Sequence, residues 1–597
     1  METSSVDKQV GPLSRGHAIQ QPLDPEPVRE MAPFGIRFSK LPRSSAVHLF
    51  IAMLGVALCI RLICLQVIAS RTFASRALRQ QMSEEVILAR PGDIVDRNQR
   101  LLATTITVPS LYANPKLIPL EERLLLASRL GAALNMSSES LLQKFEGEPQ
   151  RQFVWIKRRL TDREADAIRE LGLPSRYIGT RREFQRVYPQ GTLAAHLLGL
   201  RNIDGQGRGG IEEFFDDQLK GIDGRRRFVR DARGYVLDIL DEVMEPPQHG
   251  TALTLTIDIV LQLHVERQLD ELMQRHQAKG ACAIAIDPAT GDVLALASRP
   301  TFDPNRPERA APEDWRNMVT SATFEPGSTF KPFVAAYGLH LGLLNTNDQF
   351  DCENGVYRMG KRLLHDHHPY GLLSLTDVLV KSSNIGMAKI GERLGNVRLH
   401  QLAQAFGFGS KTGIELPGEV TGFLRPEKEW TRYSTGSIPM GHELTATPLQ
   451  MATAYAILAN HGRRISPHLL LRTGKEGPRS IPVISSPILH PEAADWMVTG
   501  PLVEVVQRGT GRQAFRPELQ IFGKTGTAQK TDAATGVYVN DRHFSSFVGG
   551  APADRPKLIV LVSVDEPQGH DQFGGSVAAP YVAEILKAGI PILQAQE

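Results

Sequence analysis

FEPGSTFKP, residues 324–332, sets a serine and a lysine three residues apart directly after a Pro-Gly pair. A helix that begins at this pair places Ser328 and Lys331 on one face, about 5–6 Å apart at their Cβ atoms, so that the amine reaches the hydroxyl and takes its proton. A Ser-x-x-Lys tetrad also occurs by chance in long chains, and alone it is better explained as an exposed helical turn with a solvated lysine. The rest of the sequence decides between the two interpretations.

Length and charge narrow the classes of protein. A chain of 597 residues predicts about three or four domain-sized units. The formal net charge of +3 gives no electrostatic support for a nucleic-acid partner. The densest basic run, Arg225–Arg227 with Arg230 and Arg233, alternates with Asp223 and Phe228, and this pattern favours a half-exposed strand.

The N-terminal region predicts a tail followed by a membrane anchor. Residues 1–45 are polar and proline-rich, which is typical of a disordered tail. Residues 46–69 form an apolar run that as a helix spans about 36 Å, against about 30 Å of hydrocarbon. Arg61 and Gln66 interrupt it, so a cleaved signal peptide or a buried helix stays an alternative, but the long tail favours an uncleaved anchor. Basic residues on the two sides balance, so charge does not settle the orientation.

Residues 70–248, called the pedestal below, carry no catalytic constellation. The pattern predicts helices at 120–134 and 162–171. Residues 90–98 and 186–191 are rich in arginine, glycine and proline, and Ala194-Ala195-His196 follows the second of them. We expect charged groups of these stretches to pair and to fix how the segments dock.

Residues 249–597 predict a sheet that encloses a helical insertion. Asp258 caps a helix to about residue 277, and two apolar strands, 280–286 and 292–298, follow with a turn between them. Further strands are expected at 521–528, 544–551 and 558–565, and a closing helix at 577–587. The order predicts an α+β domain with a five-stranded antiparallel sheet beside an all-helical subdomain, and a cleft between them.

Two later motifs supply partners for Ser328. Lys381-Ser382-Ser383-Asn384 lies in a predicted connection between helices and provides a hydroxyl and a carboxamide. Gly523-Lys524-Thr525-Gly526-Thr527 lies in the predicted strand at 521–528. We expect Gly526, which has no Cβ, to let an extended peptide lie against that strand. Ser-x-x-Lys, Ser-x-Asn and Lys-Thr-Gly in this order form a specific combination.

Three other groups of residues offer competing interpretations. Lys411-Thr412-Gly413 repeats the third motif in a glycine-rich loop without a hairpin partner, and Lys524 is preferred over it. His365-Asp366-His367-His368 has metal-ligand types, but it lacks a distant fourth ligand and predicts no metal site. Cys282 is expected to be a buried free thiol, although a bridge to Cys352 stays possible.

With these motifs the sequence resembles the penicillin-binding proteins, over nearly its whole length. Several stretches look like the class B, monofunctional branch and, within it, the septal FtsI/SpoVD type. They are residues 90–98, 186–189, 210–212, 285–291, 325–332 and 447–450. Gln99, where this family usually has glycine, and the turn Gly436-Ser437-Ile438 depart from the pattern. The resemblance implies the penicillin-binding transpeptidase fold at 249–597, preceded by a tail (1–45), an anchor (46–69) and a non-catalytic pedestal (70–248).

The resemblance also implies catalytic roles. Ser328 attacks the penultimate carbonyl of a D-Ala-D-Ala stem peptide after Lys331 takes its proton. Ser382 bridges Lys331 and Lys524 and relays the proton to the leaving group, and Asn384 holds Lys331 and the substrate backbone.

Substrate binding is implied for the strand motif. Thr525 and Thr527, with Lys524, hold the terminal carboxylate beside Gly526, and the N–H groups of Ser328 and Thr527 form the oxyanion hole. The resemblance calls for neither metal nor cofactor.

The implied function is a peptidoglycan D,D-transpeptidase that β-lactams acylate at Ser328, anchored by one pass in the cytoplasmic membrane with its catalytic domain outside the cytoplasm. The expected partners are stem peptides on lipid-linked or nascent glycan, an FtsW-type glycan polymerase and other divisome proteins. The alternatives are an elongation-specific transpeptidase, a membrane-anchored β-lactam hydrolase or sensor, and a division scaffold.

Overall fold

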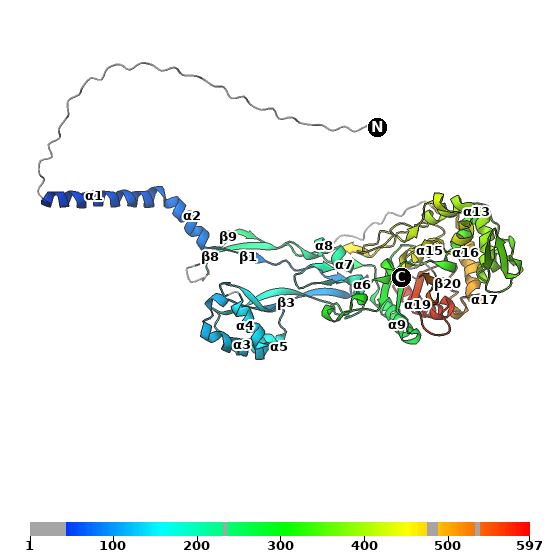
Figure 1. Ribbon diagram of the computed structural model, residues 1–597, viewed down its shortest axis with the longest axis horizontal. Helices are drawn as coiled ribbons and strands as arrows, with labels where there is room; N and C mark the ends of the chain where they lie inside the picture. The colour runs from blue at the N-terminus through cyan, green and yellow to red at the C-terminus, as the bar shows by residue number, and fades with distance from the viewer. Residues whose placement is uncertain (1–42, 148, 231–235, 475–486, 532–537, 597) are drawn as a thin grey trace, which may run out of the picture. The chain divides into compact units, whose positions relative to one another are not determined.

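The computed structural model describes residues 43–147, 149–230, 236–474, 487–531 and 538–596 (Figure 1). Most of the predicted tail, residues 1–42, and Arg233 of the basic run lie outside the described residues. The chain divides into two compact units, residues 1–83 with 229–237, and residues 84–228 with 238–597.

In the first unit, α1 (Arg43–Ile63) continues through a π-helical turn (Cys64–Ile68) and is followed by α2 (Ser70–Gln81). Residues 44–68 form a helix of 25 residues with mean hydropathy 2.4 and none of it buried, which is long and apolar enough to cross a membrane. It coincides with the predicted span at 46–69 to within two residues. A second helix, Gly574–Gln594, is also long and apolar enough to cross a membrane. It is 56% buried because it belongs to the core of residues 249–597.

In the second unit, the pedestal is built on a mixed sheet of six strands. The strand order is β19-β10-β2-β3-β4, and β5 also pairs with β3, off this path. Strand β10, which lies in the stretch predicted to belong to the transpeptidase domain (249–597), therefore belongs to this sheet, where it pairs in parallel with β2. The strands are β2 (Ile94–Val95), β3 (Leu101–Ala113), β4 (Val154–Lys157), β5 (Ile178–Val187), β10 (Leu253–Leu255) and β19 (Leu470–Thr473).

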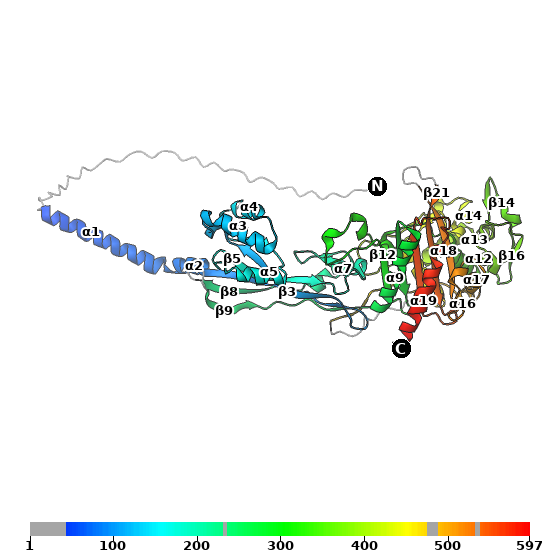
Figure 2. The ribbon, with the colours of Figure 1, turned by 90° about the horizontal axis from the view of Figure 1, so that it is seen from below.

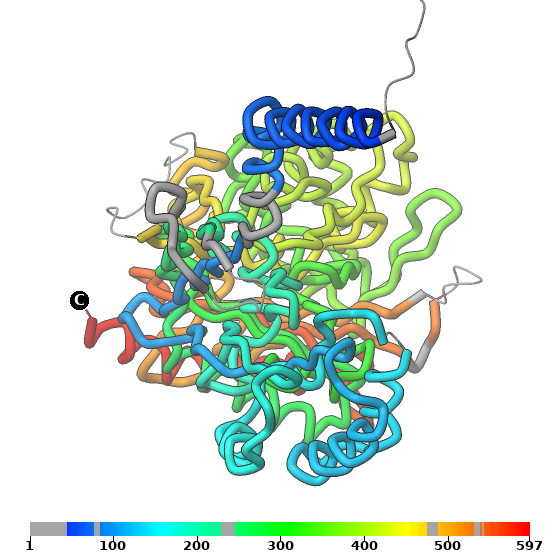
Figure 3. Tube along the Cα trace, turned by 90° about the vertical axis from the view of Figure 1, so that its left-hand side faces the viewer, coloured from blue at the N-terminus to red at the C-terminus, as the bar shows by residue number. Residues whose placement is uncertain are grey.

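Three helices cover one end of this sheet: α3 (Leu120–Leu134), α4 (Ser138–Glu146) and α5 (Asp162–Glu170). Figure 3 shows their cyan trace gathered in one cluster. The apolar positions of α3 and α4 bury Leu126, Leu130 and Phe145 in a small separate core. Thr161 and Glu164 form a capping box, which fixes the start of α5 where the sequence predicts it.

The remaining pedestal elements are short helices and strands. Glu84 and Glu85 form ion pairs with Arg225, Arg226 and Arg227, so these three arginines of the basic run lie on a partly exposed strand and their charges are paired within the protein. The elements are β1 (Met82–Ile87), α6 (Ala195–Leu198), β6 (Leu200–Arg201), β7 (Gly207–Arg208), α7 (Gly210–Phe214), α8 (Asp216–Lys220), β8 (Gly224–Arg230) and β9 (Val236–Glu245).

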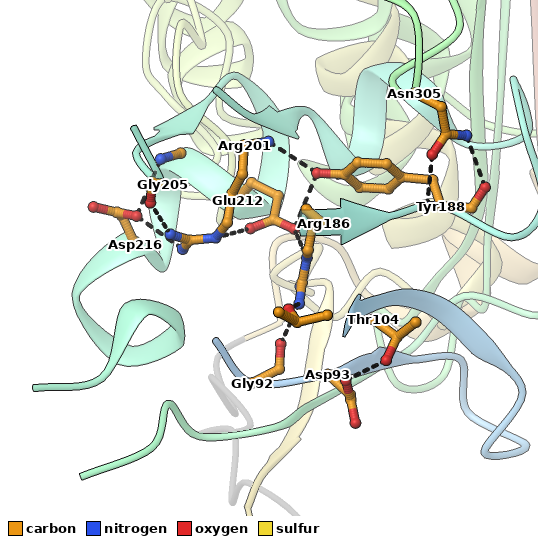
Figure 4. A network of polar contacts seen from close by, with 12 residues as sticks. Gly92, Asp93, Thr104, Arg186, Tyr188, Arg201, Gly205, Glu212, Asp216 and Asn305 are labelled. Carbon is orange, nitrogen blue, oxygen red and sulfur yellow. Dashed lines mark hydrogen bonds and ion pairs between the residues drawn. The ribbon is translucent and has the colours of Figure 1, made fainter. Parts of the chain in front are cut away.

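A buried charge network connects the two arginine-rich stretches (Figure 4). Glu212 is fully buried and accepts hydrogen bonds from Arg186 Nε at 2.6 Å and Arg201 Nε at 2.7 Å. Tyr188 donates its hydroxyl to the same carboxylate at 3.2 Å, and Arg186 also donates to the carbonyl of Gly92 at 2.6 Å. The two stretches thus meet through a backbone carbonyl, and the charge of Arg186 pairs with Glu212 outside both stretches, not with a charged group of residues 90–98 as expected.

Residues 249–597 contain the predicted five-stranded antiparallel sheet, in the order β12-β11-β22-β21-β20. Helices α9 (Ile259–His276, capped by Asp258) and α19 (Ala579–Gln594) pack side by side on one face (Figure 2). Leu269 of α9 and Val562 of the sheet are fully buried in that layer. The strands are β11 (Gly280–Ile286), β12 (Val293–Arg299), β20 (Phe522–Thr531), β21 (Tyr538–Ala551) and β22 (Leu558–Asp565), and α18 (Gly574–Val577) precedes α19.

The insertion between β12 and β20 packs on the other face and is mostly helical. Its central helix, α15 (Pro448–Ala459), is buried along its whole length. The other helices are α10 (Met318–Ser321), α11 (Lys331–His340), α12 (Leu375–Val380), α13 (Asn384–Ala405), α14 (Ser434–Ser437), α16 (Pro491–Thr499) and α17 (Pro501–Arg508).

The insertion differs from an all-helical subdomain because it also carries three two-stranded ribbons. Each strand has only two to four residues, too few for a clear alternation of apolar and polar positions. The pairs are β13 (Gln349–Asp351) with β16 (Leu372–Ser374), β14 (Val356–Met359) with β15 (Arg362–His365), and β17 (Phe423–Leu424) with β18 (Leu444–Thr445).

Candidate active site

Ser328 lies in a tight turn that leads directly into a helix. Residues Gly327–Phe330 form a 3-10 turn, and α11 begins at Lys331. Thr329 Oγ1 donates to the carbonyl of Pro326 at 2.6 Å, and the fully buried Tyr455 donates its hydroxyl to the carbonyl of Thr329 at 2.8 Å. The predicted helix start is present, and the first turn is wound more tightly than an α-helix.

Ser382 and Asn384 come from the turn between α12 and α13. Ser382 has a left-handed backbone (φ 60°), which is unusual for a residue with a side chain and aims its hydroxyl at the start of α11. Lys331 Nζ donates to Ser382 O at 2.7 Å, to Ser382 Oγ at 3.2 Å and to Asn384 Oδ1 at 2.8 Å. The first two predicted motifs are therefore in direct contact.

Ser382 Oγ joins Ser328 to both lysines. It donates to Ser328 Oγ at 2.9 Å, and it accepts from Lys331 Nζ and from Lys524 Nζ at 3.1 Å. The hydrogen-bonded path from Ser328 to Lys331 thus runs through Ser382, whereas the three-residue spacing alone predicts a direct contact. The structure brings together four residues that are up to about 200 positions apart in the sequence.

Both lysines are fully buried. Burial lowers the pKa of Lys331 to about 7, and the Asp366 carboxylate opposes part of this shift. Burial, together with the positive charge of Lys331, holds the pKa of Lys524 well below its ordinary value. A fraction of the Lys331 amines is therefore neutral near pH 7, as a proton acceptor has to be.

Strand β20 carries the third motif at the edge of the sheet. A Cβ on Gly526 would lie 2.8 Å from Thr329 Cγ2 and 2.8 Å from Ser546 Oγ. A side chain here would therefore displace the strand from the turn at Gly327–Phe330, called the nucleophile turn below because it contains the predicted nucleophile Ser328. The sequence predicts that this glycine leaves room for an extended peptide. Its close packing against Thr329 and Ser546 is a second reason for the absence of a side chain. Thr525 Oγ1 lies 2.7 Å from Thr510 Oγ1, and Thr527 Oγ1 accepts from the N–H of Gly574 at 3.1 Å.

Comparison with known proteins places the chain in a family. The model of the penicillin-binding protein transpeptidase domain matches residues 281–587, and that of the penicillin-binding protein dimerisation domain matches residues 86–255. The chain is 34% identical to stage V sporulation protein D of Bacillus subtilis, over 84% of this chain and 78% of that protein. It belongs to the class B penicillin-binding proteins of the FtsI/SpoVD type.

Two further comparisons agree with this assignment. The chain is 32% identical to the peptidoglycan D,D-transpeptidase FtsI of Escherichia coli K12, over 86% of this chain and 84% of that one. The crystal structure of penicillin-binding protein 3 from Mycobacterium tuberculosis, complexed with aztreonam, superposes with a TM-score of 0.65 at 27% identity, covering 86% of this chain and 97% of that one. The predicted α+β penicillin-binding fold with its pedestal is confirmed.

In this penicillin-binding protein a segment that the sequence did not single out supports the nucleophile turn. Gly327 N donates to the carbonyl of Gly441 at 3.1 Å, and a Cβ on Gly441 would lie 2.1 Å from the carbonyl oxygen of Gly327. Glu325 accepts from His442 Nδ1 and from the hydroxyl of Tyr538, both at 2.9 Å. These contacts carry no local sequence signal because more than 100 residues separate the partners.

The competing motifs have other partners. Thr412 donates its N–H and its hydroxyl to Glu419, so the Lys411-Thr412-Gly413 loop is closed on itself. Within the described ranges no group of three or more His, Cys, Asp or Glu side chains is arranged to hold a metal ion. Cys282 and Cys352 are both buried free thiols, so no bridge joins them.

Proposed function

We propose that this penicillin-binding protein cross-links peptidoglycan stem peptides as a D,D-transpeptidase through an acyl-Ser328 intermediate. The observation that carries the proposal is the position of Ser382 Oγ, in hydrogen-bond contact with Ser328, Lys331 and Lys524 at 2.9, 3.2 and 3.1 Å. Acyl transfer to serine requires a nucleophile with a base in reach, and here the buried amine of Lys331 is that base and the hydroxyl of Ser382 connects it to Ser328.

Acylation begins when Ser328 loses its proton to neutral Lys331. The pKa of about 7 supports Lys331 as the base, because an ordinary lysine is almost wholly protonated at neutral pH. Ser328 Oγ attacks the carbonyl of the penultimate D-alanine, and an ester bond forms as the amide bond to the terminal D-alanine breaks. The proton returns from Lys331 through Ser382 to the leaving amine.

The same geometry supports roles for the other predicted residues. Asn384 Oδ1 binds Lys331 at 2.8 Å and thereby orients the base. Lys524, with the hydroxyls of Thr525 and Thr527 on edge strand β20, binds the terminal carboxylate, and Gly526 keeps this strand against the nucleophile turn. The N–H groups of Ser328 and Thr527 stabilise the oxyanion, a contribution worth about 3–4 kcal/mol per donor.

An amine of a neighbouring stem peptide completes the reaction. It attacks the ester, the new amide bond is the cross-link, and Ser328 regains its proton. A β-lactam acylates Ser328 in the same way, and the complex of the mycobacterial relative with aztreonam supports this step. Neither a metal nor a cofactor takes part in this scheme.

The site of action follows from the anchor and the relatives. The apolar helix at residues 44–68 anchors the chain in the cytoplasmic membrane by one pass, with the catalytic domain on the outer side, where peptidoglycan lies. Relatives named FtsI and stage V sporulation protein D favour septal synthesis, with an FtsW-type glycan polymerase and other divisome proteins as partners. A fluorescent fusion in growing cells should gather at the septum, and a fusion spread along the lateral wall would indicate elongation instead.

The nucleophile is tested by labelling with a fluorescent penicillin. Full-length protein in detergent should form a stable covalent adduct, and Ser328→Ala should abolish it because it removes the hydroxyl that Ser382 connects to both buried lysines. Ser321→Ala, in α10 outside this cluster, is the matched control and should label normally. Labelling of Ser328→Ala would refute the assignment, and release of the adduct within seconds would identify a hydrolase.

A further inference from the structure

The loop that follows β15 lies against the Ser382–Asn384 turn. Asp366 is its first residue, and its carboxylate faces the first turn of α13. Oδ2 accepts from Ser383 Oγ at 2.6 Å, and Oδ1 accepts from the N–H groups of Asn384 at 2.5 Å and Ile385 at 3.1 Å. One carboxylate therefore binds three donors of the segment that presents the catalytic hydroxyl and carboxamide.

His365, the last residue of β15, fixes the other end of Asn384. Its carbonyl accepts from Asn384 Nδ2 at 3.2 Å, so Asn384 Oδ1 is the atom left to face Lys331. The hydroxyl of Ser383 also contacts Cys352 Sγ, at 3.3 Å. These contacts fix the orientation of the Asn384 amide. They also restrain Ser383 and Asn384, which follow Ser382 with its left-handed backbone.

Asp366 also supplies negative charge to the catalytic cluster. Two charged side chains interact electrostatically with Lys331, namely Lys524 of β20 and Asp366. The Asp366 carboxylate raises the pKa of Lys331 against the effect of burial. The titratable neighbours of Asp366 itself are Tyr370 and Cys352.

We propose that Asp366 is a positioning residue of the acylation reaction, which holds the Ser382–Asn384 turn against Lys331 and keeps one negative charge near Lys331. The proposal rests on the proposed function, and it assigns a role to a loop whose residue types suggested a metal site. The alternative is an ordinary helix cap, because a carboxylate at a helix N-terminus stabilises the helix wherever it occurs.

The pH dependence of acylation separates the two explanations. In the wild type, the second-order rate of labelling by a fluorescent penicillin should rise with pH along a limb centred near 7, where Lys331 becomes neutral. Asp366→Asn keeps a hydrogen-bond acceptor for the N–H groups but removes the charge. The pKa of Lys331 then falls, and the limb should move to lower pH by about half a unit to one unit.

Asp366→Ala removes both the charge and the hydrogen bonds. Its limb should move in the same direction, and its plateau rate should fall about ten- to a hundredfold because the turn loses its support. The matched control is Asp258→Asn. Asp258 caps α9 with two backbone hydrogen bonds in the same way but lies outside the catalytic cluster, so its limb should coincide with that of the wild type.

The outcomes distinguish this proposal from the proposed function. Labelling of the wild type at Ser328 tests the proposed function, and the displacement of the limb between two labelled proteins tests Asp366. A limb of Asp366→Asn that coincides with the wild type would overturn the proposal even if that variant melts at a lower temperature. Should Asp366→Ala fail to fold, Asp366→Asn alone decides.

Discussion

Two groups of buried cations in this chain have opposite surroundings. In the pedestal, Arg186 and Arg201 share the fully buried carboxylate of Glu212, each within 2.7 Å (Figure 4). In the catalytic domain, Lys331 and Lys524 share the hydroxyl of Ser382, and no carboxylate is in hydrogen-bond contact with either amine within the described part of the chain.

The difference follows from the chemistry of the two side chains. A guanidinium stays charged in proteins, so its burial requires an anion, and the paired network then locks the segments that contribute to it. An amine loses its proton when it is buried without a counter-ion at contact distance, and it becomes a base. The first arrangement fixes structure, and the second creates reactivity.

Lys331→Met should give the largest effect because it removes the base and keeps the apolar volume of the side chain. The rate of acylation by a fluorescent penicillin at pH 8 should fall about 10²- to 10⁴-fold. Lys389→Met, which removes an amine paired with Glu353 away from Ser382, is the control and should acylate at the wild-type rate. Equal rates for the wild type and Lys331→Met would show that the buried amine is structural.

Glu212→Ala should have a large effect on stability and none on the chemistry. It leaves two buried guanidinium groups without their shared anion, at a cost of about 3–5 kcal/mol in the free energy of unfolding. Calorimetry of the full-length protein should show a pedestal transition several degrees lower. Asp217→Ala, which breaks an exposed pair with Lys220, should leave this transition in place. An unchanged transition in Glu212→Ala would mean that the network does not hold the pedestal together.

Lys524→Ala tests the strand cation against its sequence duplicate. We expect a loss of about ten- to a hundredfold in acylation, since Lys524 donates to Ser382 and binds the substrate carboxylate in the proposed mechanism. Lys411→Ala should acylate normally because Lys411 is exposed in the loop closed by Glu419. A greater loss in Lys411→Ala would reverse the choice between the two motifs.

Much of the fold could be predicted because its signals are local. The strands at 280–286 and 558–565 end where the sequence predicts, since apolar runs end at turn residues such as Gly291 and Pro556. The helix at 120–134 and the cap at Asp258 follow from helical periodicity and capping chemistry. Gln99 replaces the glycine usual in this family and keeps the left-handed backbone (φ 63°) that a glycine adopts easily.

The supports of the site could not be predicted because they depend on contacts between distant residues. Tyr455 binds the carbonyl of Thr329 across 126 positions, and no pattern around either residue indicates the contact. The chain neighbours of Asp366 have the residue types of metal ligands, whereas its proposed role depends on its contacts with α13. The path from Ser328 to Lys331 through Ser382 likewise requires the left-handed backbone of Ser382, which the sequence does not reveal.

The smallest predicted effect concerns Glu325, whose carboxylate forms hydrogen bonds with groups other than the two lysines. Glu325 lies three residues before Ser328, but its oxygens are occupied by His442, Tyr538 and the N–H of Glu443. Tyr538→Phe removes one of these hydrogen bonds, which is worth about 1 kcal/mol, so acylation should slow about two- to fivefold as the nucleophile turn loosens.

Tyr357→Phe is the matched control for this last variant. Tyr357 donates to Glu392 at 2.9 Å, the same chemistry at the same distance, but on the β14–β15 ribbon away from Ser328. The two variants lose equivalent hydrogen bonds, so a slower reaction in Tyr538→Phe alone shows that the position of Glu325 matters to the nucleophile. Equal rates in both variants would show that burial of the lysines, without this restraint on a nearby carboxylate, is sufficient to keep Lys331 a base.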